Sequence, residues 1–425
     1  MTSRVYLDHA ATTPLRPEVL EAMLPWLGLA TTAGFGNAAA LNQEGRQARQ
    51  ALEAARAEVA QCIGATPPEI VFTSGGTESN NALIGGIAAA LSAQAGFKNT
   101  GGLLITSAFE HHAVLEPAQA LQRQGWRVLL LKPDHQGLIT EPSLRAALEP
   151  RETAVHCAGS GGSAGQSPAP TGSPGRPSLP SAPPVLVSIM AAQNEIGTLQ
   201  PLPELAAATH QAGALLHTDA VQALGKVAFN VQENAVDAAS FSAHKLGGPK
   251  GVGAFYLRLL TPFQPQQLGG GQEGGRRSGT ANVAGAVGLA RALSLAVAEQ
   301  ESEAQRLTAL RNELATSLLA ADRRIQLSVD PRQILALPQI LSILIAGAES
   351  ADLVLKLDQA GFAVAGGAAC SAAAAAGPSH VLLALGYSPR QAESVLRISL
   401  GAENTAADLA RFSQALLQIL ADLDN

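Results

Sequence analysis

A lysine at the end of an apolar run is the residue of this chain that points most directly to chemistry. Residues 238–243 read AASFSA, and His244 and Lys245 follow, with two glycines shortly after them. This pattern predicts a buried strand that ends in a primary amine with space around it. Such an amine can form a Schiff base with an aldehyde such as pyridoxal phosphate (PLP). Taken alone, Lys245 is more simply an exposed lysine at a strand end.

A carboxylate stands at the end of a second predicted strand, residues 215–218. Asp219 follows this strand, and Gln222 comes three residues later. A carboxylate against the ring nitrogen of PLP keeps that nitrogen protonated, which makes the ring an electron sink. Gln222 could reach the phenolic oxygen of the ring. As a single residue, Asp219 is explained equally well as a helix N-cap.

Two upstream segments have features that suit the rest of such a cofactor. Residues 69–80 (EIVFTSGGTESN) predict a strand, a glycine turn and a helix start, whose free N–H groups suit a phosphate, although similar turns open many helices. His111 follows a predicted strand at 103–106 and could stack on a pyridine ring. Adjacent His111 and His112 do not share a helix face, and no cluster of Cys or carboxylates completes a ligand set. We therefore expect no metal site.

In their order along the chain, these motifs resemble those of the cysteine desulfurases of the NifS/IscS type, among the class V aminotransferase-like PLP enzymes of fold type I. The resemblance runs nearly end to end. Further matching motifs are YLDHAATTP from Tyr6, QNEIG from Gln193, GGGQEGGRRSGT from Gly269 and GAACSAA from Gly367. Each motif alone is weak, whereas the ordered set is specific.

The resemblance assigns a role to each matching residue. It implies that Lys245 carries PLP, Asp219 pairs with its ring nitrogen, Gln222 bonds its phenolic oxygen and His111 stacks on its ring. The residues implied to hold the phosphate are Gly76, Thr77, Ser242, His244 and, from the other subunit of a homodimer, Thr280. Asn194 and Arg397 would bind the carboxylate of the substrate, for which the planar fork of Arg is suited. Without the resemblance, Arg397 could be a surface arginine, although its apolar neighbours call for a partner.

The chain has three cysteines. Cys62 continues a helical stripe of apolar residues, so we expect it to pack in a core. Cys157 opens a low-complexity segment. Cys370 lies among small residues, which suit a mobile loop that carries a thiol, although composition alone fits a buried small residue equally well. The resemblance makes Cys370 the nucleophile, whose thiolate attacks the sulfur of the substrate and keeps it as a persulfide.

The implied activity is the conversion of L-cysteine to L-alanine. The sulfur would pass to an acceptor protein, for iron–sulfur cluster assembly or for tRNA or cofactor thiolation. The alternatives within the same fold are a selenocysteine lyase, a cysteine/cystine C–S lyase and an aminotransferase. A non-catalytic relative would be expected to lack Lys245 or Cys370, and both are present.

The composition limits which binding partners and which cellular compartment we expect for this protein. A formal net charge of −6 argues against a nucleic-acid surface. Few cysteines without disulfide-like spacing suit a reducing compartment, and the first residues lack the apolar stretch of a secretory signal, so we expect a cytoplasmic protein. Residues 359–389 contain no charged side chain and are long enough to span a membrane. They are only weakly hydrophobic, so we expect a loop followed by a helix at 380–385, and no membrane partner.

Alternating strand and helix patterns predict an α/β fold with a mainly parallel seven-stranded sheet between helices. The predicted strands are 69–73, 103–106, 126–131, 185–190, 214–218, 238–242 and 252–257. They belong to a large domain, residues 16–260, with helices such as 42–63 and 110–124. Residues 1–15 and 261–425 are predicted to form a smaller α+β domain, with helices 302–320 and 405–423 and short strands near 340–345 and 395–400.

Residues 156–184 interrupt this pattern. The segment is dominated by Gly, Ser, Pro and Ala, and Arg176 is its only charge. It cannot bury enough apolar surface to offset its ordering entropy. We therefore predict a disordered surface insertion, because the sheet pattern resumes at Val185.

Overall fold

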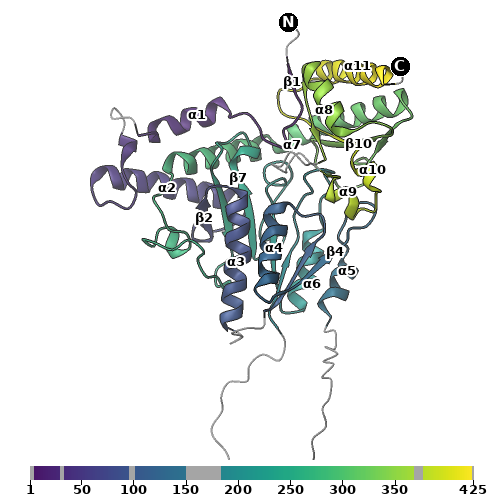
Figure 1. The fold of residues 1–425 in the computed structure, drawn as a ribbon. Helices are drawn as coiled ribbons and strands as arrows, with labels where there is room; N and C mark the ends of the chain where they lie inside the picture. The colour runs from purple at the N-terminus through teal and green to yellow at the C-terminus, as the bar shows by residue number, and fades with distance from the viewer. Residues whose placement is uncertain (1–3, 29–32, 95–100, 150–182, 368–376, 424–425) are drawn as a thin grey trace, which may run out of the picture.

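A seven-stranded sheet forms the centre of the larger part of the molecule (Figure 1). The structure is a computed structural model that describes residues 4–28, 33–94, 101–149, 183–367 and 377–423. In spatial order, the strands are β2 (Ile70–Thr73), β8 (Gly253–Leu257), β7 (Ala238–Ser242), β6 (Leu215–Asp219), β5 (Val185–Ser188), β3 (Leu103–Ser107) and β4 (Arg127–Leu131). β8 runs antiparallel to both of its neighbours, and the other pairs are parallel. The predicted mainly parallel sheet is confirmed.

Helices cover both faces of this sheet, as parallel strands require. One face packs on α3 (Gly76–Gln94) and α4 (His112–Arg123) through a core that includes Leu83, Val114 and Leu104. Neighbouring strand residues such as Ile105 face the opposite core. That core includes residues of α2 (Gln43–Cys62), α5 (Glu141–Leu148) and α6 (Leu202–Gln211).

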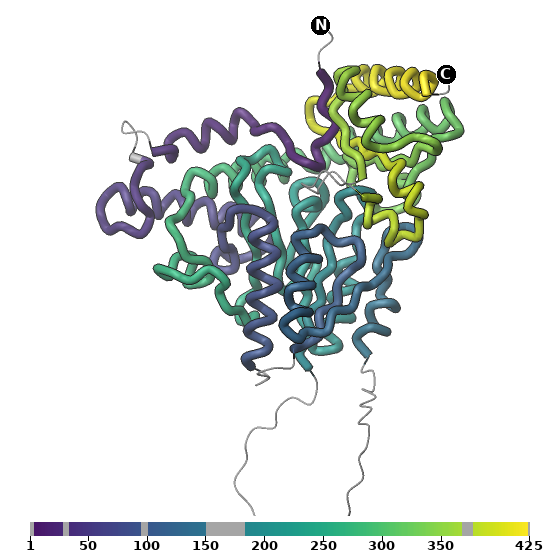
Figure 2. Tube along the Cα trace, viewed as in Figure 1, coloured from purple at the N-terminus to yellow at the C-terminus, as the bar shows by residue number. Residues whose placement is uncertain are grey.

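A second hydrophobic core lies in the part of the molecule that holds both chain ends (Figure 2). Its sheet has the order β12 (Ala365–Gly366), β13 (Val395–Ser399), β10 (Ile340–Ile345) and β9 (Ile325–Leu327), all antiparallel. β1 (Val5–Tyr6) pairs in parallel with β11 (Phe362–Ala363), which brings the N-terminal segment to this core. The helices α8 (Ser350–Gln359) and α11 (Ala406–Asp422) pack in this core. The short helices α9 (His380–Ala384) and α10 (Pro389–Ala392) instead bury their apolar residues in the core of the large sheet.

The long helix α7 (Val283–Ala321) contributes to both cores. Its first part, up to Leu293, packs in the core of the large sheet, and Leu307 to Leu318 pack in the second core. The two cores therefore meet along α7, while the division of the chain at residue 260 stays a prediction. By length and composition α7 could cross a membrane, but half of its most apolar stretch is buried inside the protein.

Several expectations from the sequence can be compared with these elements. The helix expected at 380–385 is confirmed as α9. The helix expected at 302–320 is longer than predicted, because the first half of α7 is apolar on most sides and lacks a clear helical period. Cys157, Cys370 and nearly all of the 156–184 segment lie outside the described residues.

Candidate active site

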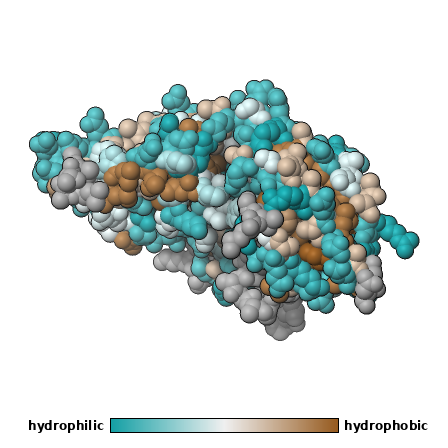
Figure 3. All heavy atoms as spheres, turned by 90° about the horizontal axis from the view of Figure 1, so that it is seen from above, coloured by the Kyte–Doolittle hydropathy of each residue, from teal (hydrophilic) through white to brown (hydrophobic). Residues whose placement is uncertain are grey.

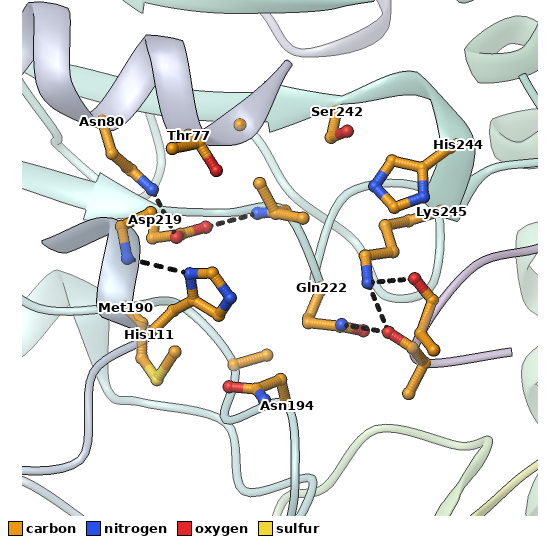
Figure 4. A pocket seen from close by; sticks show the side chains of 16 residues that line it. Thr77, Asn80, His111, Met190, Asn194, Asp219, Gln222, Ser242, His244 and Lys245 are labelled. Atoms are coloured by element: carbon orange, nitrogen blue, oxygen red, sulfur yellow. Dashed lines mark hydrogen bonds between the residues drawn. The ribbon is translucent and has the colours of Figure 1, made fainter. Parts of the chain in front are cut away.

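A cavity of about 330 Å³ opens where β6 and β7 end and α3 and α4 begin. Nine of the twelve predicted site residues line it: Gly76, Thr77, His111, Asn194, Asp219, Gln222, Ser242, His244 and Lys245. Figure 4 shows their side chains arranged around a common space. Arg397 and Thr280 do not line the cavity, and Cys370 lies outside the described residues.

Lys245 enters the cavity from a short 3-10 turn, η4 (Ala243–Lys245), directly after β7. Its Nζ donates hydrogen bonds to the backbone carbonyl oxygens of Ala10 (2.5 Å) and Ala11 (2.7 Å). The side-chain amide of Gln222 donates to the same Ala10 oxygen at 2.9 Å. The N-terminal motif therefore forms one wall of the cavity and orients the amine, a role that sequence reasoning missed.

Asp219 is a buried carboxylate, and each of its two oxygens accepts a hydrogen bond. Oδ2 accepts a 2.6 Å hydrogen bond from the side-chain amide of Asn80, and Oδ1 accepts one from the N–H of Val221 at 3.0 Å. The second bond is an Asx turn. No helix begins between Asp219 and β7, so the explanation of Asp219 as a helix N-cap is wrong. Sequence reasoning missed Asn80, although it lies one helical turn after Gly76 in the same motif.

His111 is the N-cap of α4, and its Nδ1 accepts the N–H of Ala113 at 3.0 Å. A neutral imidazole that accepts at Nδ1 carries its proton on Nε2. Burial lowers the pKa of His111, against an opposing effect of Asp219, and the charge of Lys245 lowers it further. The ring is therefore uncharged near neutral pH and holds a proton at Nε2.

The ring of the neighbouring His112 lies 6.4 Å from the ring of His111. The His112 ring lies 5.0 Å from the ring of His380, on the side of the C-terminal domain. Among the residues that the structure describes, no three His, Cys, Asp or Glu side chains gather closely enough to hold a metal ion.

Helix α3 begins at Gly76, at the edge of the cavity, and the first N–H groups of a helix have no partner within it. Gly75 has a positive φ of 155°, and a Cβ on Gly76 would lie 2.7 Å from a methyl group of Val221. The lack of a side chain at Gly76 therefore lets the helix start approach the loop after Asp219. Ser242 and His244 line the same cavity. Burial, followed by the charge of Lys245, lowers the pKa of His244 to about 4, so its ring is neutral.

Arg397 stands behind the cavity wall rather than in it. Its Nη1 donates to the backbone oxygen of Asn194, and its Nη2 pairs with Asp8, both at 2.9 Å. Its buried Nε–H has no hydrogen-bond partner in the part of the chain that the structure describes. The expected need of Arg397 for a partner is thus met by Asp8, whereas its binding of a substrate carboxylate stays a prediction.

Thr280 is exposed and lies away from the cavity of its own chain. Two ion pairs tie its loop to α2 and to α3: Arg56–Glu273, with N and O 2.6 Å apart, and Arg277–Glu78, 2.8 Å apart. A contribution of Thr280 to another subunit stays a prediction.

Cys62 is half-buried at the end of α2 and packs against the larger core, as its helical stripe indicates. Burial and the charge of Glu58 raise the pKa of its thiol to about 11. Its thiolate is therefore scarce near neutral pH, which makes it a poor nucleophile.

These side chains fit the PLP that the sequence implies. Lys245 supplies an amine for the aldehyde, and Asp219 supplies a fixed carboxylate for the ring nitrogen. Gly76 opens a helix N-terminus where a phosphate would be stabilised. His111 offers an uncharged flat ring beside Asp219 (Figure 4).

Comparison with known proteins agrees with this geometry. The profile of the family described as "Aminotransferase class-V" matches residues 5–168 and 179–412. "Cysteine desulfurase IscS" of Dictyoglomus turgidum is 40% identical over 423 residues, which cover 100% of this chain and 96% of that protein. A solved structure described as "NIFS-LIKE PROTEIN" has a TM-score of 0.81 at 33% identity, covering 98% of this chain and 99% of the other.

A second solved structure is described as "SspA in complex with cysteine". It has a TM-score of 0.72 at 30% identity and covers 93% of this chain and 98% of the other. The chain belongs to the class V aminotransferase family and, within it, to the PLP-dependent cysteine desulfurases.

Proposed function

We infer that this chain takes the sulfur atom from L-cysteine, releases L-alanine and passes the sulfur through Cys370 to an acceptor protein. The observation that carries this proposal is the cavity in which Lys245, Asp219 and His111 converge, in a chain that matches cysteine desulfurases along its whole length. One relative of the same fold was solved in complex with cysteine, which supports this substrate.

The substrate carboxylate would bind beside Asn194. The Asn194 side chain lines the cavity, and the Nε–H of Arg397 just behind it is a buried donor without a partner among the described residues. Asp8 and the Asn194 backbone oxygen hold the other two guanidinium nitrogens, so the fork of Arg397 is fixed in orientation. A fixed guanidinium binds a carboxylate at a lower entropic cost than a mobile one.

His111 is placed to move a proton. Its Nε2 carries a hydrogen in the neutral ring, because Nδ1 is occupied by the N–H of Ala113. When bound, PLP supplies an electron sink for the bond changes at the amino acid. Nε2 of His111 can then donate its proton to an atom of the reacting amino acid. The amine of Lys245 can exchange a proton with the substrate carbon.

The sulfur step needs a second thiol, which we assign to Cys370. Its thiolate attacks the substrate sulfur, a new S–S bond forms and the C–S bond breaks. The electron pair of the C–S bond stays with the amino acid, whose carbon takes up a proton to give alanine. One cysteine and one protein thiol thus become one alanine and one protein persulfide, without an external oxidant.

Product analysis tests this function. The PLP-loaded protein is given L-cysteine, and alanine, pyruvate and persulfide are measured. Alanine in equal amount to persulfide, mapped to Cys370 by mass spectrometry, is the expected result. Pyruvate with free sulfide would instead indicate a C–S lyase, and turnover confined to L-selenocysteine would indicate a selenocysteine lyase.

The assembly and place of action complete the proposal. We expect a homodimer that acts in the cytoplasm and serves iron–sulfur cluster assembly or a thiolation pathway. An apolar band on the side of α1 (Pro17–Met23) supports a partner surface (Figure 3). In this region Leu20, Leu24 and Leu27 are 42%, 45% and 51% exposed.

A further inference from the structure

The segment that leads into α9 is bound to the cavity loops at two successive residues. The Ser379 hydroxyl donates a 2.6 Å hydrogen bond to Oε2 of Glu195. The ring Nε2 of His380 lies 2.9 Å from the backbone oxygen of Glu110, to which it can only donate. Burial lowers the pKa of His380, so the ring makes this bond in its neutral form.

Each partner in these bonds is next in sequence to a residue of the cavity. Glu195 follows Asn194, and Glu110 precedes His111. The start of α9 is therefore fixed both to the loop that carries Asn194 and to the loop that carries His111. Figure 1 shows α9 at the junction between the C-terminal part of the molecule and the large sheet.

The loop that carries Glu195 is itself rigid. Oε1 of Gln193 accepts the N–H groups of Glu195 and Ile196, at 2.5 and 3.0 Å. Arg397 holds the Asn194 oxygen from the side of the C-terminal sheet. The Glu195 carboxyl group on this loop therefore has a fixed position, and it can hold the Ser379 hydroxyl in place.

The Ser379 hydroxyl has one hydrogen to donate, and the two hydrogen-bond contacts of this hydroxyl determine where that hydrogen points. Its Oγ accepts the N–H of Leu382 as the N-cap of α9, so its hydrogen points to Glu195. Ser379 and Glu195 are 2% and 7% exposed, which leaves little water to replace a lost bond. Such a buried hydrogen bond to a carboxyl group is costly to break.

We propose that Glu195 is a positioning residue for sulfur transfer, acting through Ser379 on the chain that leads from Cys370 into α9. Cys370 lies nine residues before Ser379 in the sequence. The Ser379–Glu195 bond fixes the C-terminal end of that connection relative to Asn194, where the substrate carboxylate would bind. This inference rests on the proposed function, since it assigns the bond to the persulfide step.

The test compares Ser379→Ala with Ser388→Ala. Ser388 is also an N-cap serine, at α10, but it is exposed, and the side-chain bonds described for it are with Gln391 of the same helix. Ser379→Ala should lower kcat for alanine and persulfide formation about ten- to hundredfold. KM for L-cysteine, PLP content and the absorbance change on binding L-alanine should stay at wild-type values. Ser388→Ala should retain kcat.

Two further measurements separate positioning from general damage. Ser379→Thr keeps the hydroxyl and should recover most of kcat. In a double-mutant cycle, Ser379→Ala combined with Glu195→Ala should be no slower than the slower single variant, because both remove the same bond.

The inference is wrong if Ser379→Ala turns over as fast as Ser388→Ala, or if it loses PLP and raises KM together with the fall in kcat. Additive losses in the double variant would also overturn it. If the wild-type protein itself forms no persulfide, the proposed function fails instead, so the two failures are distinguishable.

Discussion

Asn80 and Asp219 are joined by a buried 2.6 Å hydrogen bond that links the first turn of α3 to the end of β6. Through it, the helix start that would hold the PLP phosphate and the carboxylate that would hold its ring nitrogen keep a fixed separation. The other Asn80 side-chain atom, Oδ1, is buried and has no partner within the described ranges of the chain. The Asn80 side-chain amide therefore connects the predicted phosphate end of the cofactor site to the predicted ring-nitrogen end.

Asn80→Ala should weaken PLP binding about tenfold or more, because Oδ2 of Asp219 loses its donor in a buried place. PLP retained after dialysis measures the effect. The neighbouring Asn81→Ala is the control, since Asn81 is exposed and, within the described residues, its side chain bonds to the backbone oxygen of Thr77 of its own helix. Equal PLP retention by the two variants would show that the Asn80 bond does not organise the site.

The strands and their end residues could be predicted from the sequence, and the long-range partners could not. Apolar runs bounded by turns define β6 and β7 locally, and Asp219 and Lys245 follow from their places at the strand ends. The bond between Asn80 and Asp219 joins residues 139 positions apart, and the one between Asp8 and Arg397 spans 389. The local pattern of apolar residues in the sequence does not reveal such pairs, because they depend on how the sheets and helices pack.

Cys370→Ser should keep bound PLP but form almost no alanine or persulfide from L-cysteine. The substitution removes the nucleophile and leaves the cavity residues in place. Cys62→Ser is the matched control and should retain turnover, with some loss of stability from a hydroxyl in a largely apolar stripe. Parent-rate turnover by Cys370→Ser would exclude this thiol and favour a C–S lyase.

Glu110 should make the stability of the protein depend on pH. Burial raises the pKa of its carboxyl from 4.5 to about 8, against the hydrogen bonds from Ser107 and Met190. Between these values the folded state keeps a proton that the unfolded state has lost, so stability falls as the pH rises. The slope from this one group is up to about 1.4 kcal/mol per pH unit.

Glu110→Gln removes that titration while its amide oxygen can still accept both bonds. In urea unfolding at several pH values from about 5 to 8, the variant should gain stability relative to wild type as the pH rises. Glu116→Gln, at an exposed position of α4, which begins two residues after Glu110, should follow the wild-type slope. Parallel curves for Glu110→Gln and wild type would show that Glu110 ionises at its ordinary pKa in the folded protein.

Removal of residues 158–183 should leave PLP binding and desulfuration of free cysteine largely intact. The family profile has no match for residues 169–178, and the composition predicts no packed core. The deletion retains Pro184, whose backbone oxygen accepts the N–H of Leu103 beside β5. Soluble yield, PLP content and alanine formation measure the outcome, and loss of soluble holoenzyme would make the segment structural.

The prediction that Thr280 completes the site of another subunit can be tested by mixing two defective chains. Lys245→Ala removes the amine of its own cavity, and Thr280→Ala removes the proposed contribution to the partner's cavity. If Thr280 acts across a homodimer, the hybrid of these chains has one intact site, because the chain that keeps Lys245 receives Thr280 from its partner.

Co-expression with two different tags allows the hybrid to be isolated. It should bind PLP at one site per dimer as firmly as wild type and reach about half of the wild-type rate, while the pure Thr280→Ala dimer binds PLP more weakly. If Thr280 acted within its own chain, the hybrid would have no intact site and would retain PLP only as weakly as the Thr280→Ala dimer. A fully active monomer in sedimentation would contradict the shared site altogether, because the exposed Thr280 of one chain lies outside the cavity of that chain.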